Sequence, residues 1–135
     1  MRIEDDVKLD YSDVLIRPKR STLGSRKSVR VERRFKFANS KAEYEGIPIM
    51  ASNMDGVGTF TMADKLAEQG IFTCLVKTYT VSELVEFFDS IENDSNSRTN
   101  YVAYSMGITD ADHEKFRNVY EQVGDKVKYV CIDVA

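Results

Sequence analysis

The stretch "IFTCLVKTYTVSELVEFFDSIE" (residues 71–92) decides the fold class, because it holds a strand and a helix in direct succession. Residues 71–77 form a short apolar run of the kind that is buried in a sheet. Thr80 and Glu83 have the spacing of a capping box, which marks a helix start. The apolar residues that follow recur at helical spacing and predict one buried face, made of Leu84, Phe87, Phe88 and Ile91.

Strand-like and helix-like segments alternate on both sides of this unit. Apolar runs predict further strands at residues 47–52, 101–107 and 127–135. Helical spacing predicts two more helices, over residues 59–70 and 109–124. Their predicted buried stripes are Phe60, Ala63, Leu66 and Ala67 in the first, and Phe116, Val119, Tyr120 and Val123 in the second. Thr109 is the expected cap of the last helix. This alternation predicts a parallel sheet with right-handed crossovers.

Two architectures fit this order of elements: an open doubly wound sheet and part of a (β/α)₈ barrel. A complete barrel needs about 250 residues, whereas this α/β chain of 135 residues supplies the strands of half a barrel. The alternating stretch "VRVERRFKF" (29–37) predicts an antiparallel strand, paired with residues 12–18 as a flap or end-cap. We therefore expect an N-terminal extension with flap strands at residues 1–46, followed by four barrel strands and three helices at residues 47–135.

Composition limits the class of protein further. A hydrophobic content of 42% and a charged content of 30% are typical of an ordinary globular domain. The apolar runs are too short to cross a bilayer, and the charged N-terminal residues do not resemble a secretory signal. Cys74 and Cys131 lie in strand-like runs, which predicts buried reduced thiols. With His113 as the one histidine and no CxxC pair, we expect no metal site in this chain and a cytoplasmic protein.

Basic residues concentrate near the N-terminus. Residues 17–37 hold nine of the 19 lysines and arginines and a single acid, Glu32, while the rest of the chain holds ten basic residues against 21 acids. Such a segment suits an anionic ligand, a nucleic acid or an acidic neighbouring subunit, and it could equally be a solvated strand face. Nucleic acid is the weakest of these interpretations, because the chain has an acidic pI of about 5.2 and no nucleic-acid motif.

Polar residues cluster after each predicted strand. In either architecture ligands bind at the carboxyl ends of the strands. This rule selects four clusters: Ser52-Asn53-Met54-Asp55, Lys77-Thr78-Tyr79, Ser105-Met106-Gly107 and Asp133. Asp55 and Asp133 could accept ribose hydroxyls, and Lys77 could hold a phosphate, pair with Asp133 or act as an acid. The plainer alternatives are that Asp55 caps the next helix and that Lys77 is a solvated loop residue. The "GVGTF" stretch (56–60) lacks the full GxGxxG pattern and is a weak phosphate signal.

Three motifs resemble one enzyme family: "DYSDVLIRPKRSTLGSRKSV" (10–29), "IPIMASNMDGVGTF" (47–60) and "VCIDVA" (130–135). They are similar to the GMP reductases, in the superfamily of GMP reductase and IMP dehydrogenase. The resemblance implies a (β/α)₈ TIM barrel, with this chain as its N-terminal half. It also implies NADPH-dependent reduction of GMP to IMP in purine salvage, with release of ammonia, through a cysteine that attacks the purine. The resemblance further implies a homotetramer and a monovalent cation, K⁺, whose site, like the cysteine loop, follows the fourth strand. Neither Cys74 nor Cys131 matches that cysteine.

The resemblance assigns roles to particular residues. The positions that match cofactor-binding residues are Ser25, Arg26, Lys77, Asp133, Val134 and Ala135. Those that match residues packed near the purine are Ser52 and Met54. Lys77 matches a lysine beside the nicotinamide and the reacting base, which makes it the candidate catalytic residue. Ser25 and Arg26 match a position that often reaches the cofactor of a neighbouring subunit.

Three departures from the family pattern fall on the strand-end face: Gly56 and Ile108 stand where threonine is usual, and Thr78 stands where histidine is usual. They leave the kinetics and the cofactor preference open. Two alternative functions stay open as well. An IMP dehydrogenase usually carries an inserted regulatory domain, which the stretch between residues 77 and 101 lacks. A non-catalytic half-barrel that binds nucleotides or assembles is the other.

Overall fold

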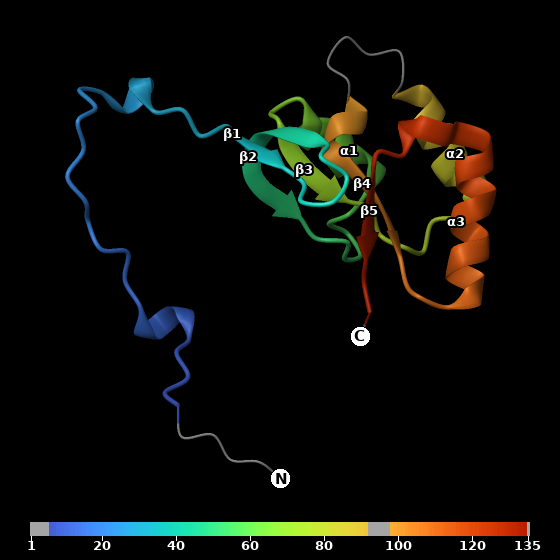
Figure 1. Ribbon diagram of the computed structural model, residues 1–135, viewed down its shortest axis with the longest axis horizontal. Coiled ribbons are helices and arrows are strands. Elements are labelled where there is room, and N and C mark those ends of the chain that lie inside the picture. The colour runs from blue at the N-terminus through green and yellow to red at the C-terminus, as the bar shows by residue number, and fades with distance from the viewer. Residues whose placement is uncertain (1–5, 92–97, 135) are drawn as a thin grey trace. The chain divides into compact units, whose positions relative to one another are not determined.

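The computed structural model describes residues 6–91 and 98–134, and it divides into two compact units, residues 1–30 and 31–135. The described part of the first unit carries two short 3₁₀ helices, η1 (Tyr11–Asp13) and η2 (Arg26–Ser28). The second unit holds the sheet and the α-helices (Figure 1). In the described parts of the chain, no helix has both the length and the apolar character needed to span a membrane.

The strands of the second unit follow the order of the sequence. They are β1 (Arg33–Lys36), β2 (Glu43–Ala51), β3 (Ile71–Cys74), β4 (Val102–Met106) and β5 (Tyr129–Ile132). β1 is antiparallel to β2, and the ladders from β2 to β5 are all parallel. A doubly wound sheet reverses its strand order at a switch point. The described strands show no such reversal, so the order favours the barrel over the open sheet.

Each crossover between parallel strands contains one helix, and each helix begins at a threonine. The helices are α1 (Phe60–Ala67), α2 (Val81–Ser90) and α3 (Asp110–Val123). The side chains of Thr59, Thr80 and Thr109 each accept a hydrogen bond from a backbone N–H three residues further on. The predicted caps Thr80 and Thr109 are therefore confirmed. The suggestion that Asp55 caps the first helix is wrong, because Thr59 takes that position.

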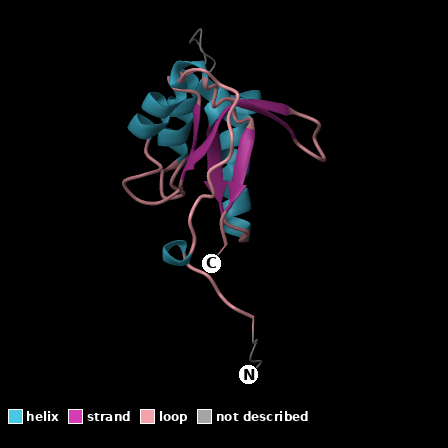
Figure 2. Ribbon diagram, turned by 90° about the vertical axis from the view of Figure 1, so that its left-hand side faces the viewer, coloured by secondary structure: helices cyan, strands magenta, loops and turns pink. Residues whose placement is uncertain are grey.

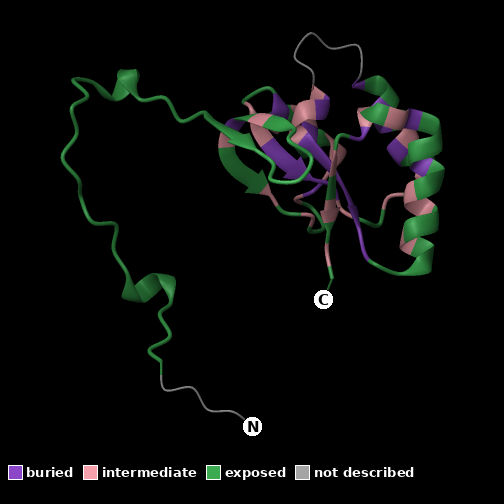
Figure 3. Cartoon of the chain, viewed as in Figure 1, coloured by how far each residue is buried: buried purple, intermediate pink, exposed green. Residues whose placement is uncertain are grey.

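The three helices cover one face of the sheet with a continuous apolar core. The stripe predicted for α2 is confirmed, with Phe88 and Ile91 completely or almost completely buried. In α3, Val119 and Val123 are buried, but Tyr120 is 42% exposed and does not belong to the core. Its hydroxyl donates to the Asp125 carboxylate at the surface, 3.2 Å away, so its polar end stays in water. Figure 3 shows burial concentrated in β3, β4 and the helix faces against them.

The opposite face of the sheet, which we call the inner face, carries a second cluster: Phe72, Cys74 and Ala103, with Tyr44, Tyr129 and Cys131 packed against it. Aromatic rings fill its amino-terminal end. The Tyr44 ring lies edge-on to Phe72, with centroids 5.6 Å apart, and Phe72 lies edge-on to Tyr129 at 5.2 Å. Edge-to-face contacts of this kind stabilise the packing beyond simple burial. The inner face is therefore closed by rings at one end, and its polar side chains are at the other.

The N-terminal strand pairs differently from the sequence expectation. The stretch 29–37 does form an antiparallel strand, β1, but its partner is the first half of β2 and not residues 12–18. Phe35 stands opposite Tyr44, and the Phe37 N–H donates to the Ala42 carbonyl at 2.9 Å to close the hairpin loop. A short loop costs less chain entropy than the longer connection to residues 12–18. The hairpin extends beyond the parallel strands (Figure 2), and the expected boundary between residues 46 and 47 falls within β2.

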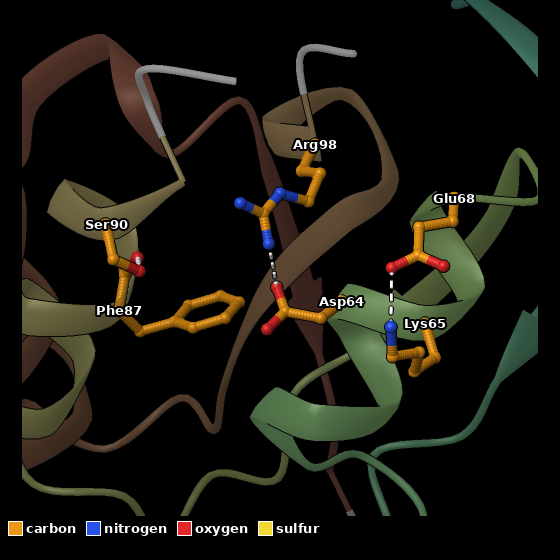
Figure 4. A network of polar contacts seen from close by, with 6 residues as sticks. All are labelled: Asp64, Lys65, Glu68, Phe87, Ser90 and Arg98. Atoms are coloured by element: carbon orange, nitrogen blue, oxygen red, sulfur yellow. Dashed lines mark hydrogen bonds and ion pairs between the residues drawn. The ribbon is translucent and has the colours of Figure 1, made fainter. Parts of the chain in front are cut away.

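An ion pair joins α1 to η3 (Arg98–Tyr101), the 3₁₀ turn that leads into β4. The Arg98 guanidinium donates to Asp64 Oδ1 at 2.7 Å, and both side chains are partly buried (Figure 4). The neighbouring Lys65–Glu68 pair is exposed and joins α1 to the residue that caps its C-terminus. Because partly buried pairs are screened less than exposed ones, the Arg98 contact contributes more to holding the entry of β4 beside α1.

We predict that Gly58→Ala destabilises the protein. Gly58 is buried, and its carbonyl accepts a hydrogen bond from Val76 N–H at 2.8 Å. A Cβ at this position would lie 2.8 Å from Val76 N and would also collide with the Cys74 carbonyl oxygen, both rigid backbone atoms. We expect a loss of about 1–3 kcal/mol in the free energy of unfolding, measured by urea denaturation. Gly24→Ala, where no atom lies within 4 Å, is the matched control; equal effects of the two would contradict the prediction.

Candidate functional site

The carboxyl ends of the parallel strands bring together segments that are far apart in the sequence. The loop after β2 (residues 52–59), the turn after β3 (75–80) and the short segment after β4 (107–109) all leave the sheet at this edge. Asp133 continues the β5 ladder there, with its N–H donating to the Met106 carbonyl at 2.9 Å. The clusters selected from the sequence thus share one edge, as parallel pairing requires.

A direct bond connects the first and last of these segments. The Asn53 side-chain amide, Nδ2, donates to Asp133 Oδ2 at 2.9 Å, and both side chains are half-buried. Side chains alternate along β5, and Cys131 faces the inner side, so Asp133 projects to that side too. In the described parts of the chain this is the one side-chain hydrogen bond found for the Asp133 carboxylate. The other carboxylate oxygen is left as an acceptor at the mouth of the inner face.

The turn after β3 is held by contacts to its backbone and to Tyr79. Lys115, on α3, donates from Nζ to the Lys77 carbonyl oxygen at 2.8 Å. The Tyr79 ring stacks on Phe60 at 3.8 Å, and its hydroxyl accepts from the Phe60 N–H at 3.4 Å. The Lys77 side chain itself is exposed, and within the described residues it forms no ion pair. An ion pair between Lys77 and Asp133, one of the suggested roles, is not found among the described residues; the side-chain partner described for this carboxylate is the Asn53 amide.

Charges at the start of α3 surround this turn. Hydrogen bonds from the Thr109 hydroxyl and backbone hold the pKa of Asp112 below its usual value, and the Gly107 N–H and the Lys77 charge act in the same direction. Burial lowers the pKa of Lys115, while the nearby Asp112 carboxylate opposes that shift. The Asp112 carboxylate and the Lys77 side chain thus lie close enough to interact across this turn.

The inner face next to this edge holds one unpartnered hydroxyl and two thiols. Ser105 Oγ is buried and has no hydrogen-bond partner among the described residues. Cys74 is buried as expected, but Cys131 is only half-buried. Burial, with the neighbouring Cys131 adding to it, raises the pKa of Cys74 to about 12. Because the thiolate is the reactive form of cysteine, this shift favours the unreactive thiol form of Cys74.

The remaining predicted site residues are placed as follows. Ser52 and Met54 are exposed in the loop after β2, on the same segment as Asn53. Val134 is exposed beyond the end of β5, and Ala135 lies outside the described residues. Ser25 and Arg26 belong to the first unit, where the Ser25 hydroxyl accepts from the Lys27 N–H at 3.2 Å and so caps η2. These assignments stay predictions.

Two of the three departures from the family pattern have visible structural settings. Gly56 has a φ of +73°, a left-handed conformation that costs other residues about 1–2 kcal/mol. A threonine at this position would be strained, so the loop has the shape that glycine allows. Ile108 is 61% exposed, two residues after the end of β4. Both changes therefore alter the surface of the candidate site without entering the core.

An apolar cleft beside the β1–β2 hairpin is separate from this polar edge. It has a volume of about 380 Å³ and is lined by Phe35, Phe37, Tyr44, Ile47, Pro48, Ile49, Met50 and Phe72. Ligand sites usually combine apolar walls with a few convergent polar groups. This lining has no charged side chain and one phenol, Tyr44. The strand-end edge, with Asn53, Asp133 and Lys77, is therefore the better candidate for nucleotide chemistry.

Sequence reasoning missed two contacts that shape the site. The strand-end rule selected the cluster containing Asn53 but gave it no role, and it did not consider Lys115 at all. Asn53 and Asp133 are 80 residues apart, and Lys77 and Lys115 are 38 apart. No local pattern in the sequence signals either contact. The parallel order of the strands was the one signal that could have placed Asn53 and Asp133 at the same edge.

The fold and the site define a class before any relative is considered: an α/β protein of the barrel type, with polar groups at the carboxyl ends of its strands. Residues 8–135 match the family described as "IMP dehydrogenase / GMP reductase domain". The chain therefore belongs to the IMP dehydrogenase / GMP reductase family. The family resemblance noted in the sequence motifs is confirmed.

Relatives named GMP reductase match the chain from end to end. The protein from Shigella boydii is 48% identical over 135 residues, which is 100% of this chain and 38% of that protein. The protein from Caenorhabditis elegans is 48% identical over 134 residues, covering 99% of this chain and 36% of that protein. The chain thus spans little more than a third of the length of these relatives and corresponds to their N-terminal part.

A solved structure supports the fold. The crystal structure of inosine 5′-monophosphate dehydrogenase from Legionella pneumophila superposes with a TM-score of 0.67 and 23% identity. The match covers 92% of this chain and 34% of that one. The chain has the fold of the N-terminal portion of a TIM barrel, as expected from the sequence.

We predict that Asp112→Asn weakens stability in a pH-dependent way. The folded pKa of Asp112 is lowered, so its stabilising contribution is present above its usual pKa of 3.8 and is lost as the pH falls through the folded value. The variant should be less stable than the wild type at neutral pH, and the difference should shrink below pH 3.8. Urea denaturation at several pH values measures this. Asp110→Asn, in the same helical turn but outside the capping box, is the control; the same pH profile in both variants would contradict the prediction.

Proposed function

We propose that this chain is the N-terminal part of a GMP reductase, which uses NADPH to reduce GMP to IMP and releases ammonia in purine salvage. Relatives of that name at 48% identity support the proposal. The observation that carries it is the placement of Lys77 and Asp133. Both lie at the carboxyl-end edge of the sheet, where barrel enzymes bind their ligands. The resemblance of the sequence motifs implies that they correspond to family positions beside the cofactor.

The residues at this edge fit a nicotinamide nucleotide. The ribose hydroxyls and the carboxamide of such a cofactor are hydrogen-bond donors, and the Asp133 carboxylate has an oxygen that no described side chain occupies. Ser105 Oγ adds a buried hydroxyl without a partner on the same inner face. When bound, NADPH supplies the hydride. The basic segment with Ser25 and Arg26 is the proposed contact for the anionic part of a cofactor bound by a neighbouring subunit.

Lys77 is the proposed catalytic residue. Reduction of GMP to IMP takes up protons together with the hydride, because the amino group leaves as ammonia. Lys77 lies in the turn after β3, where Lys115 holds its backbone carbonyl, and its side-chain ammonium group is proposed to hold and deliver such a proton. Ser52 and Met54 are proposed to pack near the purine, and Val134 and Ala135 to run along the cofactor.

Other parts of the proposal concern the complete protein. The nucleophilic cysteine that the resemblance implies is neither Cys74 nor Cys131, and we place it, with the K⁺ site, in the part of the barrel beyond these four strands. By itself this chain should be inactive. We propose a cytoplasmic homotetramer whose partners are GMP, IMP and NADPH, with neither nucleic acid nor a membrane. An IMP dehydrogenase is the less favoured alternative. The similarity of this chain to the Legionella pneumophila enzyme, at 23% sequence identity, supports the fold but not the activity.

We predict that Lys77→Ala and Asp133→Ala each impair the complete enzyme. Removing a residue that transfers a proton should lower kcat about 10²-fold or more, so Lys77→Ala should reduce kcat at saturating NADPH. Asp133→Ala should mainly raise the KM for NADPH, because it removes an acceptor for the cofactor. The assay follows the loss of the reduced nicotinamide absorbance with GMP as substrate.

Lys65→Ala is the matched control, since this lysine is exposed on α1 and pairs only with Glu68 in the described structure. It should have wild-type kinetics. Wild-type rates in both site variants would refute the assignment of the site. A complete protein that oxidises IMP with NAD, and does not reduce GMP, would replace the proposed function by the alternative.

A further inference from the structure

We infer that Asn53 is a positioning residue that orients the Asp133 carboxylate toward the bound nicotinamide nucleotide. This inference rests on the proposed function of the site. Its basis is the hydrogen bond from Asn53 Nδ2 to Asp133 Oδ2, 2.9 Å long and half-buried. The bond joins the loop after the first parallel strand to the end of the fourth, across the mouth of the inner face.

Asn53 is suited to this role because its backbone is fixed. The loop folds back on itself, with the N–H groups of Val57 and Gly58 donating to the Met54 carbonyl at 3.0 and 2.9 Å. Gly58 packs so closely against the loop that a Cβ there would lie 3.1 Å from the Asn53 Cα. Gly58 is in turn bonded through its carbonyl to Val76, after β3. The Asn53 amide therefore extends from a rigid turn and not from a free loop.

The hydrogen bond from Asn53 gives the two oxygens of the Asp133 carboxylate different roles. A carboxylate at the end of a strand can rotate about its side-chain torsions and present either oxygen. With Oδ2 held by Asn53, the other oxygen is left for a ligand, since no described side chain donates to it. A ligand with a hydroxyl or amide donor then meets an acceptor that is already oriented, which reduces the entropy lost on binding. Asn53 need not touch the ligand to have this effect.

The same contact could instead serve only to hold β2 and β5 together. The two interpretations predict different behaviour for a double variant, the reversed pair, in which residues 53 and 133 exchange their side chains. In the double variant Asn53→Asp with Asp133→Asn, the amide and the carboxylate exchange places and the hydrogen bond can re-form. A structural link would then be restored in full. A binding acceptor would not, because the carboxylate would sit on the wrong segment.

The experiment measures NADPH affinity by calorimetry, and GMP-dependent kinetics, in the complete protein. We expect Asn53→Ala to weaken NADPH binding about tenfold while the KM for GMP stays within about twofold of the wild type. In the Asp133→Ala background the same change should have no further effect, since interacting residues are not additive. The reversed pair should recover thermal stability but not NADPH affinity.

Asn100→Ala is the matched control, because Asn100 also makes a side-chain bond between distant segments, to Lys128 at 2.6 Å, but near the amino ends of the strands. It should leave NADPH affinity unchanged. If Asp133→Ala weakens binding but Asn53→Ala does not, or if the reversed pair regains wild-type affinity, the positioning role is wrong while the proposed function stands. If the wild-type protein does not bind NADPH, both are wrong.

Discussion

The helix-side core is the constraint on which the rest of this structure depends. Phe88 of α2 and Val119 of α3 are completely buried, and Val102 of β4 is 1% exposed beneath them. Burying a large apolar side chain contributes about 1.5–3 kcal/mol, so this layer fixes both the helices and the strands below them. Since every crossover returns to the same amino-terminal edge, the strands must be parallel, and their carboxyl ends must meet at one edge. The meeting of Asn53 and Asp133 follows from that geometry.

Local features of this fold could be predicted from the sequence, and contacts between distant segments could not. The α2 stripe and the caps at Thr80 and Thr109 are encoded within single turns of helix, and the structure confirms them. The partner of β1, by contrast, could have been either residues 12–18 or β2. The alternation of apolar and polar residues in 29–37 predicts a strand but does not decide between these two partners. Tyr120 has helical spacing like Val119, yet its hydroxyl keeps it at the surface. Helical spacing predicts which side of a helix a residue lies on, but a polar group at the end of the side chain can keep that residue at the surface.

In the candidate site, too, the positions of residues could be predicted from the sequence, but the contacts between distant segments could not. The rule that ligands bind at the carboxyl ends of strands selected both Asp133 and Lys77 from their positions, and the family resemblance then gave each a role. The sequence could not show which group would occupy the carboxylate, because Lys77 and Asn53 were both within the selected clusters. Charge alone favours lysine, but the rigid turn formed around Gly58 places the Asn53 amide within bonding distance instead. Lys77 is thereby left free of an ion pair among the described residues, with its backbone held by Lys115.

The exposed apolar residues at the last strand agree with the length of the relatives. Tyr104 and Met106 of β4 are 2% and 5% exposed under the helices, whereas Val130 and Ile132, on the same side of β5, are 44% and 65% exposed. Burying such side chains would stabilise the fold by about 25 cal/mol per Å² of apolar area removed from water. In a (β/α)₈ barrel, a helix follows each strand and covers side chains of this kind. The inner face has the opposite arrangement, with Tyr44, Phe72 and Tyr129 packed at its amino end. Because those rings pack at the amino end, the polar groups available to a ligand lie at the opposite, carboxyl-end edge of the inner face.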